Sequence, residues 1–360
     1  MKEKSAKNGG KTYRILYHSI ALFFLLGFTV FLFKPFLEAG FPSGFDSIGH
    51  CFKVKYIADT LIKYGRFVDW WEPWYCGHHL LLFYPPLSYI LPVILQIFLN
   101  DPALAVKISI ALGVFFAALS MYFLILVLIE KGKNDLFRTM AAVGGAAAYA
   151  FSPALIHFYA ETGLFSSFYA MVFVPLCFIP LIKWLRTGRR SFLVGYAFLL
   201  AIIFFFHGMA ATMVGFGSIL FVAVYLASAR MTKSSGEPIF KGIFLLFLAL
   251  VLFVGLTAIW WVPYFAQIQE IGRGVMFDPS APTHSIPLRY LFKRGDASYI
   301  GISFYIGFCA IFLSIFAPLF RKHRAEALGF WATLLFGMII SLGTNTPIYQ
   351  HLPLISTVPP

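Results

Sequence analysis

Apolar runs long enough to cross a membrane follow one another along almost the whole chain. A bilayer core of about 30 Å needs about 20 helical residues to cross it. Lipid satisfies no backbone hydrogen bond, and the alternating pattern of a β-barrel is missing from the sequence, so these runs are expected to be helices. The sequence predicts an all-α polytopic membrane protein with about nine transmembrane helices, over 15–33, 103–128, 140–157, 168–184, 192–206, 210–229, 242–265, 301–320 and 327–342.

The charge of the chain indicates its orientation in the membrane. Only 12% of residues are charged, which excludes a soluble globular domain, and the net charge is +13. A nucleic acid is not the expected partner, because the basic residues gather in short connections between apolar runs, as cytoplasmic loops do. The bilayer is the expected partner, with the protein in the plasma membrane, its N-terminus cytoplasmic and its first helix retained. The basic stretches are 1–14, 131–138, 183–190, 230–241 and 321–324.

A count of crossings limits the topology. If the basic stretches 1–14 and 131–138 are both cytoplasmic, only one of the two apolar runs that follow the first outer loop can cross. We expect the run 80–99 to be a re-entrant or surface segment on the outer face, because Tyr84, Pro85, Pro86 and Pro92 interrupt its start and deny helical hydrogen bonds. The predicted organisation is a cytoplasmic N-terminus, a membrane domain and an outer tail, over 1–14, 15–342 and 343–360, with large outer loops at 34–102 and 266–300.

Polar residues concentrate in the loops that this topology places outside. Asp46 and His50 are four residues apart, so on a helix they share a face and both could reach one ligand. A carboxylate beside an imidazole suits general-base chemistry or a metal ion. The alternative is that Asp46 only caps the helix that follows.

The next outer stretch is rich in aromatic residues and contains Trp74, Tyr75 and His78. Tryptophan and tyrosine at a membrane edge form an interfacial belt, although a sugar-binding platform is the functional alternative. At most one of His78 and its neighbour His79 is expected to bind a metal, because adjacent side chains diverge. Cys51 and Cys76 share the same loop and could form a disulfide, but the sequence does not fix their distance.

Further polar residues follow near the outer ends of later runs. Glu161 ends the third predicted crossing, either as a functional carboxylate or as a solvated loop residue. His207 lies between two short runs, where a packing role is the alternative to ligand binding. The loop 267–300 carries cations that suit a lipid-linked phosphate or anionic head groups, namely Arg273, Arg289, Lys293 and Arg294.

Together these motifs resemble a known layout. The matching stretches are FDSIGH at 45–50, WYCG at 74–77, YPPL at 84–87, ETG at 161–163 and LGTNTP at 342–347. The chain is similar to the GT-C integral-membrane glycosyltransferases, and it most resembles the membrane module named 6-pyruvoyl-tetrahydropterin synthase-related. The pterin part of that name has no counterpart here, since the sequence contains no soluble pterin-synthase pattern. Measured against the family, the outer tail 343–360 is expected to be truncated.

The resemblance implies transfer of a sugar from a polyprenyl-phosphate-linked donor to a glycan, lipid or protein acceptor on the outer face. Asp46 would be the catalytic carboxylate and Glu161 the second acidic position, and the two could bind a divalent cation, magnesium or manganese. The substrate would be bound by outer-loop residues, namely His50, Trp74, Tyr75, His78, His207, Arg273, Arg289, Lys293 and Arg294.

Two other functions remain open from the sequence. A transporter or flippase of a lipid-linked or anionic envelope precursor would place polar residues at mid-membrane. Apart from Lys107, the predicted spans contain almost none, which favours the enzyme. A non-catalytic scaffold for envelope assembly is the third possibility.

Overall fold

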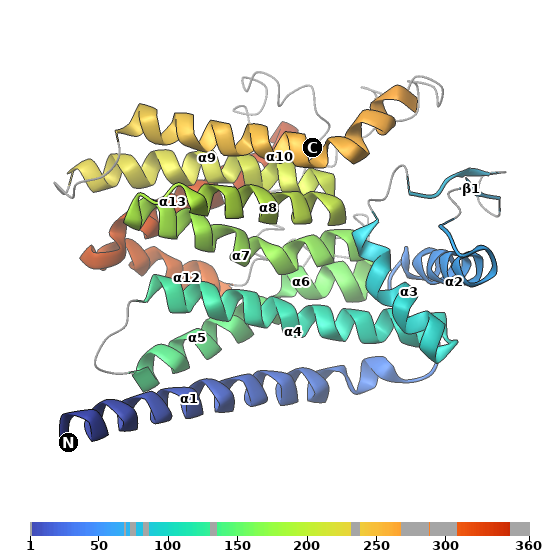
Figure 1. Ribbon diagram of the computed structural model, residues 1–360, viewed down its shortest axis with the longest axis horizontal. Coiled ribbons are helices and arrows are strands. Elements are labelled where there is room, and N and C mark those ends of the chain that lie inside the picture. The colour runs from blue at the N-terminus through green and yellow to red at the C-terminus, as the bar shows by residue number, and fades with distance from the viewer. Residues whose placement is uncertain are drawn as a thin grey trace. The chain divides into compact units, whose positions relative to one another are not determined.

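The computed structural model describes residues 2–67, 70–72, 77–81, 86–129, 135–231, 238–267, 288 and 308–345. Helices dominate these residues, and seven are long and apolar enough to cross a membrane, which confirms the prediction of an all-α polytopic membrane protein. The chain divides into two compact units (Figure 1). Unit 1 contains Met1–Leu80 and Pro86–Ile182, and unit 2 contains Leu81–Pro85 and Lys183–Pro360.

Unit 1 is a helical bundle that carries one short hairpin. Its elements are α1 (Lys2–Phe33), η1 (Pro35–Leu37), α2 (Ser47–Tyr64), β1 (Trp70–Trp71), β2 (His78–His79), α3 (Leu87–Leu99), α4 (Pro102–Leu128), α5 (Asp135–Ala150), α6 (Pro153–Ile156), the π-helical turn η2 (His157–Thr162) and α7 (Phe165–Thr187), whose last residues belong to unit 2. Helix α4 packs against α1, α2, α3 and α5 and so forms the centre of the unit.

Local sequence explains where α4 begins. Asn100 ends α3 in the left-handed conformation, with φ of 51°. Asp101 then caps α4, accepting a hydrogen bond from the backbone N–H of Leu104 at 3.0 Å, and Pro102 occupies the first turn. An acidic cap followed by proline is a typical helix start. Farther along α4, Gly113 lets Phe168 of α7 approach closely, because a Cβ there would lie 2.6 Å from the Phe168 ring.

Helix α3 is the apolar run that was not expected to cross. With 13 residues it is about 20 Å long, which is shorter than a bilayer core. The expectation that Pro92 interrupts it was wrong, because α3 begins directly after Pro86 and continues through Pro92. An interior proline removes one helical hydrogen bond and crowds the preceding turn, but Pro92 is buried, so packing within the unit offsets this cost. The re-entrant or surface position of this segment stays a prediction.

The predicted spans agree with the described helices in most places. The runs 140–157, 168–184, 210–229 and 242–265 fall within longer apolar helices. The run 192–206 is one of three shorter apolar helices. For the run 301–320, the structure describes only the part that begins at Phe308.

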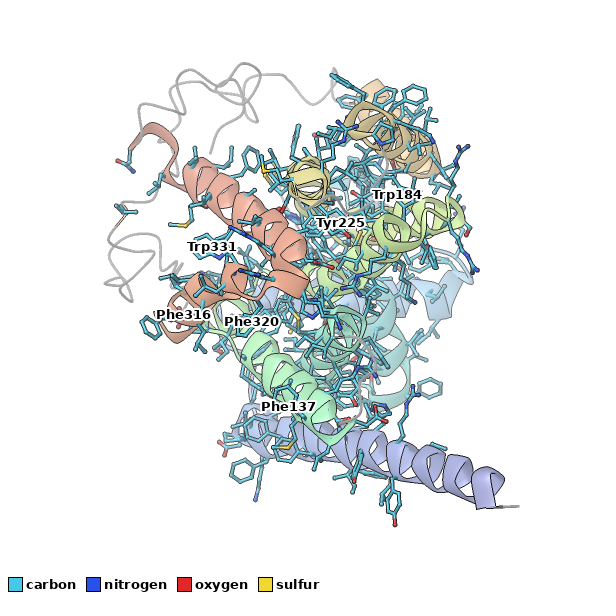
Figure 2. All side chains as sticks on the ribbon, turned by 90° about the vertical axis from the view of Figure 1, so that its left-hand side faces the viewer. Phe137, Trp184, Tyr225, Phe316, Phe320 and Trp331 are labelled. Carbon is cyan, nitrogen blue, oxygen red and sulfur yellow. The ribbon has the colours of Figure 1, made fainter. Side chains whose placement is uncertain are left out.

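Unit 2 is built around a close pair of helices, α9 and α13. Its elements after α7 are α8 (Ser191–Phe206), α9 (Gly208–Met231), α10 (Ile239–Gln267), α12 (Phe308–Phe316), η3 (Ala317–Leu319), η4 (Arg321–His323), α13 (Arg324–Leu342) and η5 (Gly343–Asn345). The Thr333 hydroxyl of α13 donates to the carbonyl of Gly217 on α9 at 3.0 Å. Trp331 of α13 donates its indole N–H to the carbonyl of Ser314 on α12 at 2.8 Å, and Figure 2 shows Trp331 on the same side as Phe316.

A buried ion pair joins two elements of unit 2. Both Nε and Nη2 of Arg186 donate to Oε1 of Glu326, at 3.1 and 2.7 Å, and only 8% of the Glu326 side chain is exposed. Replacing Glu326 by alanine leaves the guanidinium without this carboxylate, so we expect the free energy of unfolding to fall by about 3 kcal/mol. Thermal unfolding of the purified protein in detergent measures the change.

The matched control is the exposed pair of Lys55 and Asp59, whose charged atoms are 2.9 Å apart but whose side chains are half exposed. Replacing Asp59 by alanine should cost less than about 1 kcal/mol, because water screens this pair. Equal losses in the two variants would contradict a stabilising role for burial of the Arg186–Glu326 pair.

Candidate functional site

Asp46 lies at the N-cap position of α2, as the helix-cap alternative proposed, but its side chain makes no capping hydrogen bond. The side chain is exposed. The first turn of α2 is closed by backbone bonds, including the one from the His50 N–H to the Asp46 carbonyl at 3.0 Å. The Asp46 carboxylate is therefore available to a ligand.

Glu161 lies on the π-helical turn η2, which follows the helix break at Ser152 and Pro153. The hydroxyl of Thr162 donates to the carbonyl of His157 at 3.1 Å across this wider turn. Gly163 then ends it in the left-handed conformation, with φ of 74°. Turns of this kind are rare and often occur at functional sites, because the inserted residue changes the direction of the side chains.

His157 supports the Glu161 carboxylate from within the unit. Its Nδ1 donates to Oε2 of Glu161 at 2.8 Å, with 2% of the His157 side chain exposed against 31% for Glu161. The imidazole therefore fixes one carboxylate oxygen while part of the group remains open to solvent. The sequence analysis missed His157, although its position one helical turn before Glu161 could have indicated the pair.

A backbone contact brings the Asp46 and Glu161 segments together. The Asp46 N–H donates to the Thr162 carbonyl at 3.1 Å. A Cβ on Gly44 would lie 2.5 Å from the Gly163 nitrogen, and a Cβ on Gly163 would lie 2.6 Å from the Ser47 Oγ. Both glycines also have φ values that favour glycine, 112° and 74°. The segments that carry the two predicted acidic residues are thus in direct contact within unit 1.

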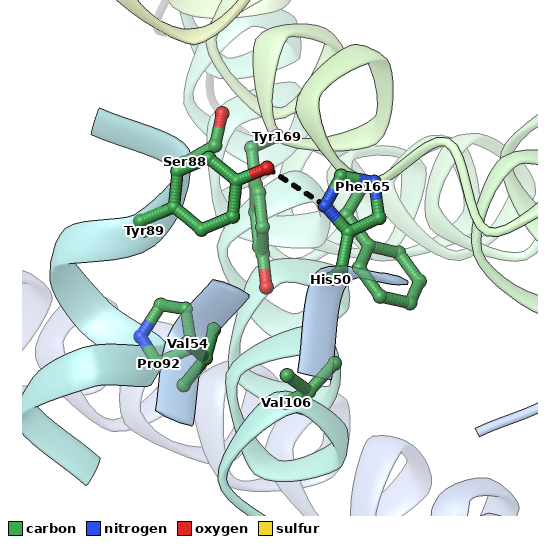
Figure 3. A pocket seen from close by; sticks show the side chains of 8 residues that line it. All are labelled: His50, Val54, Ser88, Tyr89, Pro92, Val106, Phe165 and Tyr169. Carbon is green, nitrogen blue, oxygen red and sulfur yellow. Dashed lines mark hydrogen bonds between the residues drawn. The ribbon is translucent and has the colours of Figure 1, made fainter. Parts of the chain in front are cut away.

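His50 lies behind this contact, in the interior. Only 4% of it is exposed. Its Nδ1 shares a hydrogen bond with the Tyr89 hydroxyl at 2.9 Å, and its ring lies 5.0 Å from that of Phe165 (Figure 3). The imidazole therefore connects α2 to α3 and to the start of α7. Asp46 and His50 were expected to present one face to a ligand, but the first is exposed and the second is buried.

A small cavity lies beside the His50 imidazole. Its volume is about 10 Å³, close to the space that one water molecule needs. Figure 3 shows that its lining combines polar and apolar side chains from α2, α3, α4 and α7, namely His50, Val54, Ser88, Tyr89, Pro92, Val106, Phe165 and Tyr169.

Burial, with a smaller contribution from the Lys53 charge, lowers the pKa of His50 from 6.5 to about 3. The unfolded chain therefore binds a proton below pH 6.5 that the folded protein does not bind, and stability falls as the pH decreases from 6.5 toward 3. We expect His50 to contribute a slope of about 1.4 kcal/mol per pH unit in this window.

Thermal unfolding of the wild type and of His50→Gln between pH 7 and 5 measures this contribution. Glutamine has no group that titrates here but keeps an amide for the Tyr89 hydroxyl, so its stability should depend less on pH. Parallel curves for the two proteins would show that His50 is not held neutral.

An aromatic hairpin packs on α2 next to a buried lysine. Trp71 of β1 is 3% exposed, and the Lys53 ammonium lies 5.6 Å from the centre of its ring. Burial lowers the pKa of Lys53 to about 8, an effect that the negative charge of Asp46 partly opposes. The Tyr56 hydroxyl fixes the hairpin by donating to the Trp70 carbonyl at 2.5 Å. Lys53 is a second residue that the sequence analysis did not select.

The hairpin places Trp70 opposite His79 and Trp71 opposite His78. The Trp70 and His79 rings meet edge to face at 5.5 Å, and a Cβ on Gly77 would lie 2.4 Å from the Trp70 ring. The described part of the aromatic stretch therefore packs on itself and on α2. Trp74, Tyr75, Cys76 and the side chain of His78 lie outside the described residues. Cys51 is a buried free thiol.

The other predicted site residues are in unit 2 or outside the described residues. His207 precedes α9, and its Nδ1 accepts the Ala210 backbone N–H at 3.2 Å, so the imidazole caps that helix. The late cations fall outside the described part of the chain, namely Arg273, Arg289, Lys293 and Arg294. Among described residues, no three histidine, cysteine, aspartate or glutamate side chains form a metal-binding group.

Comparison with known proteins identifies the family. A family model described as a 6-pyruvoyl-tetrahydropterin synthase related domain, membrane protein, matches residues 81–360. The match includes Glu161 and begins after Asp46 and His50. No curated protein matches the chain. Because the model covers most of the sequence, the chain belongs to the 6-pyruvoyl-tetrahydropterin synthase-related family of membrane proteins.

Proposed function

We propose that this protein is a membrane glycosyltransferase of the GT-C type, which moves a sugar from a polyprenyl-phosphate-linked donor to an acceptor at the outer face of the plasma membrane. The observation that carries the proposal is the backbone contact between the Asp46 and Glu161 segments, held by the Asp46–Thr162 hydrogen bond and by the approach of Gly44 to Gly163. It joins an exposed carboxylate and a partly exposed one at the end of an apolar helix.

The two carboxylates suit different parts of the reaction. Asp46, which makes no capping bond, would accept the proton of the acceptor as the acceptor attacks the anomeric carbon. The bond between that carbon and the phosphate oxygen breaks, and the phosphate leaves with its electron pair. Glu161, fixed by His157, would orient the acceptor. The late cations, which follow in the sequence, would stabilise the departing phosphate.

The number of carboxylates in this pair is suitable for a divalent cation. Magnesium is often bound through one or two protein carboxylates, with water and substrate phosphate completing its shell. Asp46 and Glu161 are the residues that would hold it, and it would neutralise charge on the donor phosphate. The cation would thus act together with the substrate and would not need a third protein ligand.

The environment of Lys107 agrees better with an enzyme than with a transporter. This lysine, 4% exposed on α4, donates from Nζ to the carbonyl of Glu38 at 2.5 Å. A buried cation bonded to the backbone of a neighbouring loop has a structural explanation and needs no transported anion.

The proposal is tested by comparing the glycans of cells that have or lack the gene. Lipid-linked sugars and surface glycans are extracted from both and measured by mass spectrometry. We expect the deletion to remove one sugar from the acceptor and to accumulate its lipid-linked donor, and the mass difference identifies the sugar. Accumulation of the donor on the cytoplasmic side only, shown by its protection from added glycosidase, would instead indicate a flippase. No change in any glycan would exclude the transferase.

A further inference from the structure

An apolar patch covers the beginning of α2 around Asp46. Phe45 and Ile48 are 78% and 49% exposed, and Phe52, one turn farther along, is 55% exposed. Phe41 in the preceding loop completes the patch, with its ring 6.4 Å from that of Phe52. We call Phe41, Phe45, Ile48 and Phe52 the α2 apolar patch. Large exposed apolar side chains that gather in this way mark a contact surface.

The same exposed stripe of α2 carries a charged pair after the patch, before the exposed Ile62 in the last turn of the helix. Lys55 and Asp59 continue the spacing of Ile48 and Phe52 along the helix, and both are exposed and paired with each other at 2.9 Å. Water is the environment that this charged pair requires. A boundary between an apolar and an aqueous environment therefore falls between Phe52 and Lys55, about two turns from the start of α2.

The direction of α2 within unit 1 agrees with such a boundary. In Figure 1, α1 and α4 run across the view, whereas α2 is strongly foreshortened, so α2 crosses the direction of the two spans. A helix in this orientation at the end of a transmembrane helix lies along the membrane surface. Exposed apolar residues also precede the patch along the chain, with Val30 and Phe31 near the end of α1 and Leu37 on η1.

We propose that the first two turns of α2 lie in the interface of the lipid bilayer, with the α2 apolar patch in contact with the acyl chains of the leaflet in which α1 ends. The occupant of the patch is lipid, because the patch closely follows a transmembrane helix with exposed apolar side chains in the sequence and is itself followed by an exposed charged pair. Interfacial helices bind bilayers in this way, with their apolar face at the boundary of head groups and acyl chains.

This contact would hold Asp46 at the membrane surface, because Asp46 lies between Phe45 and Ile48. The polar head of a membrane-anchored substrate lies at the same depth. The inference does not depend on sugar transfer, since its test measures the depth of α2 and no reaction. A failed transferase test would leave the membrane contact standing, and a failed depth test would leave the transferase standing.

The experiment uses the full-length protein in vesicles of phosphatidylcholine and phosphatidylglycerol. Cys76 and Cys309 are replaced by serine, and the buried Cys51, whose pKa burial raises to about 12, and the buried Cys177 are retained as poorly reactive thiols. A nitroxide is attached in turn to Phe45→Cys, Ile48→Cys and the control Lys55→Cys. Collision rates with oxygen, which concentrates in lipid, and with a water-soluble nickel chelate report the environment of each label.

We expect labels at positions 45 and 48 to collide severalfold more often with oxygen than with the nickel chelate, and the label at 55 to show the reverse. Equal nickel access at all three positions would overturn the proposal by placing the patch in water. Low access to both agents at 45 and 48, with spin–spin broadening, would overturn it in favour of contact with a second copy. Each protein is first shown to be monodisperse, and Phe52→Cys replaces any variant that is not.

Discussion

Replacing Asp46 by asparagine is expected to lower the rate of sugar transfer by about 10²- to 10⁴-fold, the range that a general base contributes. Asparagine keeps the size of the side chain and remains a good residue at a helix N-cap, so α2 should still form. The carboxylate makes no capping bond in the native protein, which removes the main structural reason for a loss. The rate is measured in membranes, with a lipid extract of the deletion strain as donor, by mass spectrometry of the product.

Asp59→Asn is the matched control for this measurement. Asp59 is also an exposed carboxylate on α2, and it pairs with Lys55 on the surface. We expect this variant to keep the rate of the wild type within about twofold, since a screened surface pair contributes little. If Asp46→Asn also kept the rate, the carboxylate would not be catalytic, and a scaffold or a transporter would explain the glycan phenotype better.

The helical fold could be predicted because transmembrane helices depend on one strong signal. Runs such as 103–128 and 242–265 are apolar over the whole length of a bilayer core, and lipid leaves them no alternative to helix. The sequence predicts less well those features that depend on tertiary packing. Proline usually ends a helix, yet α3 continues through Pro92, and the π-helical turn that carries Glu161 has no distinct sequence pattern.

The sequence indicated several candidate site residues, but it did not indicate how these residues are arranged in space. Asp46 and Glu161 could be predicted because charged residues are rare in this chain, and a carboxylate near a membrane is costly unless it has a function. The four-residue spacing wrongly predicted that Asp46 and His50 face the same ligand. A residue at an N-cap projects from the start of the helix and need not share the environment of a residue one turn later. Lys53 and His157 were missed because their partners are fixed by tertiary packing.

The contact between the two acidic segments could not be seen in the sequence either, because it depends on two glycines far apart in the chain. Replacing Gly163 by alanine adds a Cβ that would lie 2.6 Å from Ser47 Oγ and 2.8 Å from its backbone nitrogen. The backbone of the Asp46 segment would have to move, and φ of 74° adds strain of about 1 kcal/mol or more. A displacement of about 1 Å in an active site can cost about 10²-fold in rate. We expect a loss of this size in the same transfer assay.

Gly65→Ala separates strain from displacement. Gly65 ends α2 with φ of 65°, close to the value at Gly163, but a Cβ there would meet nothing within 4 Å. Both variants should therefore lose a similar amount of thermal stability through their backbone conformation, and only Gly163→Ala should lose activity beyond that. Gly44→Ala, whose Cβ would lie 2.5 Å from the Gly163 nitrogen, should reproduce the loss from the other side of the contact. Full activity in Gly44→Ala and Gly163→Ala would mean that Asp46 and Glu161 do not have to be held together, and the two carboxylates would then not form one site.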